Sequence, residues 1–354
     1  MITTSFISTT SLSDETRRSI ARIQASLVDA QKELSTGRHA DVGVTLGAST
    51  GITVSMRQDL NHIQSIQGTN NIVLTRMQAS QSALQTIADK AGVFLSALVG
   101  AQSTSSMPDT IAQEAQAGMQ TLQEQLNSSL DGQFLFSGIN SDVKPMDDFF
   151  SGTPSASRQS VTGAFTAKFG MSPDDPAVAS ISASDMQDFL DNEFSDLFSD
   201  ANWANNWSAA SDKAVTNRIS RTEVAATSTT ANDTAFRKLT QAYAMVSGLG
   251  FTNLNAATQQ AVVQKATTLV GEATGGLTKV QSFLGVTQQR VTDTNDQIDA
   301  QIDFLTKSIG NLESVDPTTV TTQISTLTTQ LEAAYSLTNR LNNLSLMDYL
   351  TPSS

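Results

Sequence analysis

Two apolar stripes, one near each end of the chain, constrain the fold more than any other feature. In both, apolar side chains recur in steps of three and four residues, the spacing of one face of a coiled-coil helix. Helices of this length are marginal alone in water. We therefore expect both stripes to be covered by neighbouring subunits. The first stripe comprises Ile20, Ile23, Leu27, Ala30 and Leu34, and the second comprises Leu327, Leu331, Ala334, Leu341 and Leu344.

Capping residues set the limits of the expected helices. The first helix runs from about residue 13 to residue 34, with Ser11 or Ser13 as its cap and a left-handed Gly37 after its end. Residues 38–51 contain three glycines and are predicted to form an extended loop. Further helices are predicted over 52–99, from about 108, from about 234 to 312, and after the break at Asp316-Pro317.

The middle of the chain has a different pattern. A short strand is predicted at 134–136, and the alternation of Val161, Phe165 and Phe169 with small residues predicts another. Residues 182–200 are predicted to form an amphipathic helix capped by Ser184, with Gln187 completing a capping box. Residues 141–200 hold 11 acidic side chains against 3 basic ones, so we expect this part to be solvated.

The order of the segments predicts a mainly α fold. It is nearly symmetric, because a striped helix lies at each end, longer helices lie inside these, and a different segment lies in the middle. The prediction is a long antiparallel helical bundle or coiled coil built from both chain ends, with a mixed α/β insert domain in the middle. Residues 1–42 and 313–354 would form a terminal coiled-coil domain. Residues 43–140 and 235–312 would form a helical bundle domain with a short β-hairpin, and residues 141–234 an acidic, surface-exposed insert domain.

Composition argues against several functions. The chain has no cysteine, so no disulfide or thiolate site is possible. Its net charge of −13 disfavours binding to nucleic acid. The sequence contains no run of 18 apolar residues, so no membrane span is predicted. The first residues lack a basic segment followed by an apolar one, so we expect any export to proceed without a cleaved signal peptide.

Candidate catalytic and ligand-binding residues are few. His39 and His62 are interpreted as loop and surface residues, and the acidic residues between Asp185 and Asp200 as the solvated face of a helix. Trp203 and Trp207 are interpreted as core of the insert, with ligand stacking as the alternative. We predict no enzyme activity, no catalytic or metal site and no cofactor. An enzyme hidden in the insert, an adhesin acting through the two tryptophans and a signalling coiled coil remain the alternatives.

Three motifs resemble those of the flagellin superfamily, over about residues 1–140 and 235–354. They are "LSTGRHADVG" after the first helix, "DGQFLFSGINSDVKP" at 131–145 and "LGVTQQRV" at 284–291. The first departs from the family pattern, because "DVGVTLGAS" replaces the usual Asp-Asp-Pro. The ending "SLMDYL" resembles the proteins of the hook–filament junction more than flagellin, the major filament subunit, which is the alternative.

The resemblance implies structural work rather than catalysis. It implies export by the flagellar type III apparatus, a chaperone at the C-terminal helix, and an extracellular position at the junction of hook and filament. The implied partners are other copies of the chain, the first hook-associated protein and flagellin. The residues expected to pack between subunits are Ile20, Ile23, Leu27, Leu34, Leu327, Leu331, Leu341, Leu344, Leu346, Tyr349 and Leu350.

Overall fold

The computed structural model describes residues 9–103, 108–152 and 154–350, with side chains described except at 9–13, 103 and 341–350. The described residues belong to two compact units. The terminal unit comprises Met1–His62 and Asp299–Ser354, and the central unit comprises Ile63–Ile298. The long helices α3 (Thr50–Ser103) and α10 (Ala256–Glu313) contribute residues to both units.

Long antiparallel helices dominate both units, which confirms the predicted fold class. The strands are short and lie in the middle of the sequence. The remaining helices are α1 (Thr9–Thr36), α2 (Val42–Leu46), α4 (Pro108–Leu126), α5 (Ala156–Phe169), α6 (Ala183–Asp191), α7 (Glu193–Asp196), α8 (Asp200–Asn206), α9 (Thr234–Gly248) and α11 (Pro317–Leu350). Short 3-10 turns cover Gly47–Ser49, Pro176–Ser180 and Phe251–Asn253.

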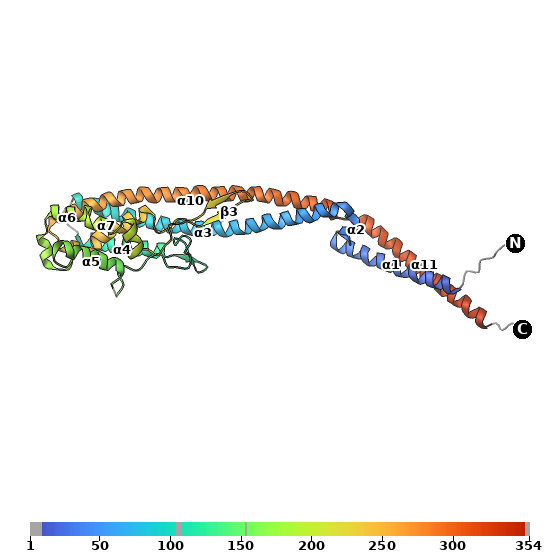
Figure 1. The fold of residues 1–354 in the computed structure, drawn as a ribbon. Coiled ribbons are helices and arrows are strands. Elements are labelled where there is room, and N and C mark those ends of the chain that lie inside the picture. Colours follow the sequence, from blue (N-terminus) through green and yellow to red (C-terminus); the bar gives the residue numbers. More distant parts are fainter. Residues whose placement is uncertain (1–8, 104–107, 153, 351–354) are drawn as a thin grey trace. The chain divides into compact units, whose positions relative to one another are not determined.

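In the terminal unit, α1 and α11 lie side by side and antiparallel (Figure 1). Gly37 follows α1 with a φ of 69°, a left-handed conformation that glycine adopts without strain. Asp316 accepts the Thr318 N–H at 2.9 Å, which caps the start of α11 beside Pro317. The predicted end of the first helix and start of the last are therefore confirmed.

The prediction of an extended loop over 38–51 is wrong, because these residues form α2 and the turn Gly47–Ser49. The Asp41 side chain accepts the Val44 N–H at 2.9 Å and caps α2. The three glycines suggested a loop, but a good N-cap was sufficient to start a short helix.

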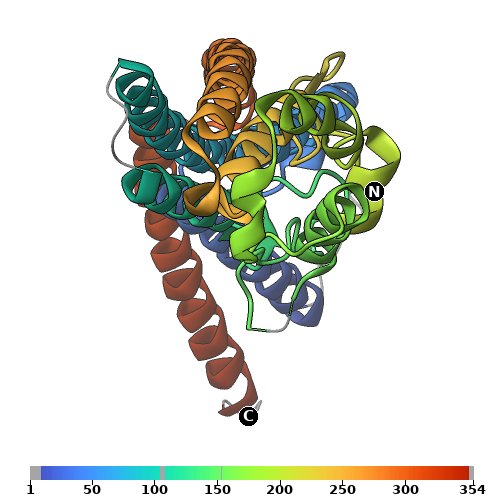
Figure 2. The same ribbon diagram turned by 90° about the vertical axis from the view of Figure 1, so that its left-hand side faces the viewer.

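Most buried apolar side chains of the central unit belong to one large core. Its centre is α9, whose residues from Leu239 to Val246 are all buried, with α4 packed along it. From α3, the side chains of Met77, Leu84 and Phe94 are fully buried in the same core. The segment between α4 and α9 contributes to this core too, and Figure 2 shows its green helices beside the rest of the unit.

Two antiparallel hairpins flank the helices of the central unit. Strand β1 (Ser129–Leu130) pairs with β2 (Gln133–Phe134), and β3 (Thr216–Arg218) pairs with β4 (Val224–Ala226). Asp131 and Gly132 both have positive φ, as a two-residue hairpin turn requires. A short hairpin is therefore present near residue 134, but its second strand covers Gln133–Phe134 rather than the predicted 134–136.

Two local predictions in the middle segment need correction. Residues 161–169, predicted as a strand, lie in helix α5, whose first turn is capped by the Ser155 hydroxyl. Val161, Phe165 and Phe169 are four residues apart, so their spacing also fits a helix face. The cap of α6 is Ser182 rather than Ser184, and it accepts the Asp185 N–H at 3.1 Å.

Candidate assembly surface

The described residues offer no obvious chemistry for ligands. Among them, no group of three or more His, Asp or Glu side chains is placed to hold a metal ion. None of the described helices is long and apolar enough to cross a membrane. His39 lies 3.6 Å from Glu33 in the terminal unit, and His62 is exposed. Asp188 and Glu193 both pair with Lys168 at 2.7 Å.

The tryptophan pair is buried. Trp203 and Trp207 stack with ring centroids 5.8 Å apart, and Trp207 stacks on Phe149 at 5.6 Å. The side chains of both tryptophans are at most 3% exposed. The interpretation of these residues as core is confirmed, and an adhesin site built on their exposed rings loses its basis.

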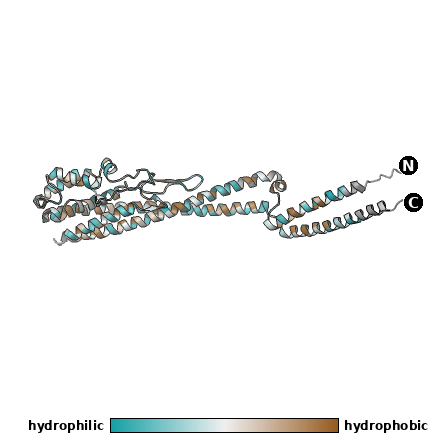
Figure 3. Cartoon of the chain, turned by 90° about the horizontal axis from the view of Figure 1, so that it is seen from below, coloured by the Kyte–Doolittle hydropathy of each residue, from teal (hydrophilic) through white to brown (hydrophobic). Residues whose placement is uncertain are grey.

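The two terminal stripes face each other along α1 and α11. Figure 3 shows apolar residues in brown recurring along α1 and along the described part of α11. Gln24 of α1 donates to the Tyr335 hydroxyl of α11 at 2.9 Å, which ties the helices midway. The positions that turn inward repeat every three and four residues, as in a coiled coil. They are Thr16, Ile20, Ile23, Leu27 and Ala30 on α1, and Val320, Ile324, Leu327, Leu331, Ala334 and Thr338 on α11.

This seam is covered only in part. Ile20, Ile23 and Leu27 remain half-buried, as do Leu327 and Leu331 across from them. Two helices alone cannot enclose a stripe, because each leaves the flanks of the other open. The large side chains predicted to pack between subunits therefore keep apolar surface that another helix would cover.

Four large residues of α1 and α11 lie outside the inward-turning positions and are exposed. Val28 is 62% exposed, Leu34 43%, Tyr335 46% and Leu337 52%. Leu34 is among the residues predicted to pack between subunits, whereas that prediction does not include the other three. These three residues lie beside inward-turning positions. Helical periodicity alone assigns such neighbouring positions to the solvated face.

The apolar stripe of α11 leaves the seam near its described end. Up to Ala334 the stripe and the seam coincide, but the next inward position is Thr338, whose hydroxyl donates to the Ala334 carbonyl at 2.8 Å. The neighbouring apolar residue Leu337 is exposed instead. The side chains of Leu341, Leu344, Leu346, Tyr349 and Leu350, also predicted to pack between subunits, lie outside the described residues.

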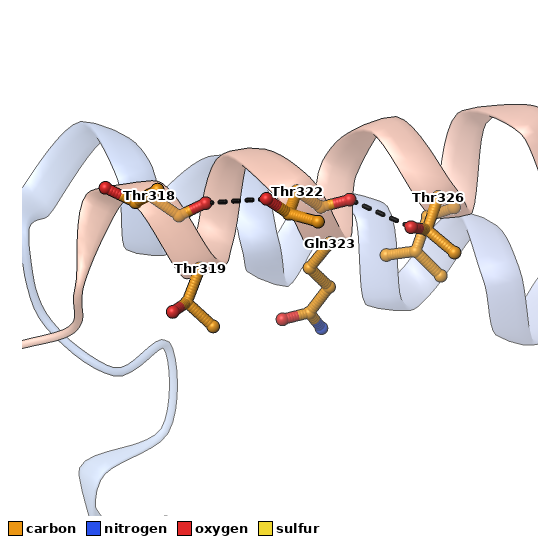
Figure 4. A pocket seen from close by; sticks show the side chains of 6 residues that line it. Thr318, Thr319, Thr322, Gln323 and Thr326 are labelled. Carbon is orange, nitrogen blue, oxygen red and sulfur yellow. Dashed lines mark hydrogen bonds between the residues drawn. The ribbon is translucent and has the colours of Figure 1, made fainter.

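An open groove of 440 Å³ runs along the start of α11. Figure 4 shows Thr318, Thr322 and Thr326 in a row on one face of the helix. The Thr322 hydroxyl donates to the Thr318 carbonyl, and the Thr326 hydroxyl donates to the Thr322 carbonyl, both at 2.9 Å. Because the Thr322 and Thr326 hydroxyls have partners within the helix, covering this face would leave neither of these two donors unpaired. The other lining residues are Thr319, Gln323 and Leu327.

Both ends of the chain match helical regions of the same protein family. Residues 7–141 match the bacterial flagellin N-terminal helical region, and residues 267–350 match the bacterial flagellin C-terminal helical region. The comparison with curated proteins found no match.

Among solved structures, the fold is similar to a chain from Vibrio parahaemolyticus provisionally assigned as a flagellar hook-associated protein. That similarity has a TM-score of 0.51 at 9% sequence identity, and it covers 75% of this chain and 97% of the other. At this identity the likeness shows the fold alone.

Proposed function

Because the chain belongs to the flagellin family, we propose that it is a structural subunit of the layer that joins the flagellar hook to the filament. Members of this family are structural components of the flagellum rather than enzymes. The observation that carries the proposal is the half-buried seam of α1 and α11 with its exposed flanking residues. A surface of that kind is stabilised when further copies pack on it.

The position at the junction is supported by the ending of the chain and by its fold. Residues 345–350, "SLMDYL", resemble the finish of junction proteins more than that of flagellins. The Vibrio protein with the similar fold carries a hook-associated assignment as well. A major filament subunit is the alternative, since the two matched helical regions are those of flagellins.

We propose the partners that such a layer needs. They are further copies of this chain, the first hook-associated protein on the hook side and flagellin on the filament side. Delivery would use the flagellar type III export apparatus and a chaperone bound to the C-terminal helix, without a cleaved signal peptide. The proposed location is outside the cell, in the flagellum.

Substituting Leu331 by Asp tests the assembly surface. Leu331 lies in the seam of α11, and a charge there is costly when a neighbouring helix covers it. We expect L331D to give a soluble chain that is not incorporated into flagella and does not support motility. The matched control is Q330D, which places the same charge at the adjacent exposed position. Normal motility and filament yield in L331D would refute the assembly role.

Immunogold electron microscopy tests the position. Antibody against residues 141–234 should label one band where the hook meets the filament. Label along the whole filament would instead make the chain a filament subunit. The position of the label distinguishes a junction subunit from a filament subunit, even if both would assemble through the same surface.

A further inference from the structure

An open groove of 360 Å³ lies in the central unit, where three parts of the sequence meet. One wall is α3, and the second is the hairpin of β1 and β2 with the residues that follow it. The third wall is the hairpin of β3 and β4 with its flanking residues. Pockets for small molecules span about 300–1,000 Å³ and combine apolar walls with a few polar groups. The groove has the size and the composition of such a pocket.

Arg76 of α3 supplies the positive charge of the groove. Its guanidinium donates to Gln133 Oε1 at 3.1 Å and to the Phe134 carbonyl at 3.4 Å. Both acceptors are neutral, whereas Arg237 and Arg290 of the same unit pair with carboxylates. Among the described residues, no carboxylate forms an ion pair with Arg76. The guanidinium therefore lacks an anionic partner.

Burial leaves the charge of Arg76 without full hydration. It lowers the pKa of Arg76, and the charge of Asp131 offsets only part of this effect. Because a guanidinium is not deprotonated in proteins, Arg76 stays charged in spite of burial. A partly desolvated cation is stabilised by an anion that accepts its hydrogen bonds, and a carboxylate matches the planar guanidinium best.

The other polar side chains of the groove also leave donors available. Gln133 Oε1 accepts from Arg76, and Ser228 Oγ accepts the Val215 N–H at 2.8 Å. Among the described residues, neither the Gln133 amide group nor the Ser228 hydroxyl donates a hydrogen bond. The acceptor atoms are thus in use while donors remain. This arrangement favours a ligand that accepts hydrogen bonds, and the charge of Arg76 favours an anion.

Apolar side chains form much of the rest of the groove. Val73 and Leu135 are buried at its base. Ile72 is 61% exposed and Ile139 is 55% exposed, and these two residues come from different walls. A ligand with an apolar body would remove isoleucine surface from water, which stabilises the bound state. A bare anion would leave this surface exposed.

We propose that the groove binds a small organic carboxylate with an apolar body. The carboxylate accepts hydrogen bonds from Arg76 and Gln133, and the apolar body lies against Ile72 and Ile139. The site lies within the central unit and does not depend on the proposed junction role. Its test is therefore independent of the tests of assembly.

Ligand-observed NMR on the full-length, unassembled chain at pH 7 tests the site, with 4-methylpentanoate as the probe. We expect 4-methylpentanamide, which has the same shape without the charge, to bind about tenfold more weakly or less, the effect of losing a hydrogen-bonded charge. Acetate and inorganic phosphate should also bind more weakly, because neither has an apolar body. No binding of the acid, or equal binding of the acid and its amide, would overturn the proposal.

The variant R76Q tests the role of the guanidinium. We expect the affinity for 4-methylpentanoate to fall about tenfold or more. The matched control is R218Q, which removes the same charge from an exposed arginine of β3 that does not line the groove. R218Q should bind the probe as the unsubstituted chain does. Equal affinities in R76Q and R218Q would show that Arg76 is not part of a site.

The variant I139E provides a second test should R76Q disturb the hairpin of β1 and β2. Because Ile139 is exposed, the fold should tolerate the change. The new carboxylate would repel the probe or compete for Arg76, so we expect the affinity to fall about tenfold or more, and I139Q to lose less. Should the probe fail to bind while R76Q and I139E change the sedimentation of the chain, the groove holds a side chain of a second copy and the proposal is wrong.

Discussion

At the scale of single residues, Gly118 of α4 lies directly against the Tyr243 ring of α9 in the core. A Cβ atom built on Gly118 would lie 2.3 Å from the Tyr243 ring, a distance that no side chain tolerates. Phe94 packs on the other part of the ring, with centroids 5.0 Å apart, so the ring has little room to move. Glycine at 118 is therefore what lets α4 and α9 pack together.

We predict that Gly118→Ala destabilises the central unit by about 1–3 kcal/mol, as overpacking of a filled core does. Urea unfolding followed by tryptophan fluorescence measures this, because Trp203 and Trp207 belong to the same core. Gly92→Ala is the control, since its Cβ would meet nothing within 4 Å. That variant should be neutral or more stable by about 0.5–1 kcal/mol, because alanine favours helix. Equal effects of the two substitutions would contradict the packing argument.

The Tyr243 hydroxyl is buried and finds no hydrogen-bond partner among the described residues. Burial, together with the charge of Glu114, raises the pKa of Tyr243 well above its ordinary value. Well below pH of about 10 the phenol is neutral in both the folded and the unfolded chain. The free energy of unfolding therefore does not depend on pH through this group. As pH rises further, only the unfolded chain ionises, so stability falls.

We predict that Tyr243→Phe removes this loss. Relative to the variant, the unsubstituted chain should lose about 1 kcal/mol between pH 10 and pH 11, because a phenol with the ordinary pKa of about 10 is already half ionised in the unfolded chain at pH 10. At pH 7 the variant should be at least as stable, because an unsatisfied hydroxyl is gone. Urea midpoints at the three pH values measure both effects. Parallel pH profiles for the two chains would show that the phenol ionises in the folded protein.

At the scale of elements, the hairpin of β3 and β4 is attached to α3 and α10 by side-chain hydrogen bonds and a small apolar cluster. Asn70 of α3 donates to the Ile219 carbonyl at 2.9 Å and to Asn295 Oδ1 at 2.8 Å. Ile219 is fully buried against Val291. Glu223 of the hairpin pairs with Arg290 of α10 at the surface. The contact lies apart from the main core of the central unit.

We predict that Asn70→Ala frees this hairpin. Two buried acceptors would lose their donor, at a cost of about 1–3 kcal/mol. Hydrogen exchange over 216–226 should accelerate about tenfold or more, while α9 keeps its rate. Thr75→Ala is the control, because Thr75 is exposed on the same helix. Unchanged exchange in the hairpin would mean that the apolar contact of Ile219 alone holds it.

The long helices could be predicted from sequence because periodicity, Gly37 and Pro317 agreed on their limits. The segment 156–169 was harder, because Val161, Phe165 and Phe169 satisfy both a two-residue and a four-residue period. The choice was made by burial against α9, a tertiary contact that local pattern does not contain. The ion pairs of Glu313 with Arg38 and Arg57 were missed for the same reason, since nothing near Glu313 in the sequence identifies these arginines as its partners.

At the scale of the molecule, the two units differ in how much apolar core each one has. Among the described side chains of the terminal unit, the buried apolar ones are Ala30, Ile309 and Val320. Thr16, Thr53 and Glu313 are buried beside them and are polar. The central unit instead buries rows of leucine, phenylalanine and tryptophan in one core. Stability of a region follows its buried apolar contacts, so the terminal unit is the weaker one.

We therefore predict that the unassembled chain opens in two stages, with the terminal unit first. Amides of 14–36 and 317–340 should exchange at least 100-fold faster than those of α9, a difference of about 2.7 kcal/mol in opening free energy. The same amides should become protected in isolated flagella, because neighbouring copies would cover the half-buried seam. Mass spectrometry of exchange in both states measures the change. A single opening transition for both units in the free chain would mean that the α1–α11 pair is stable without neighbours. The exposed stripe residues would then no longer argue for assembly.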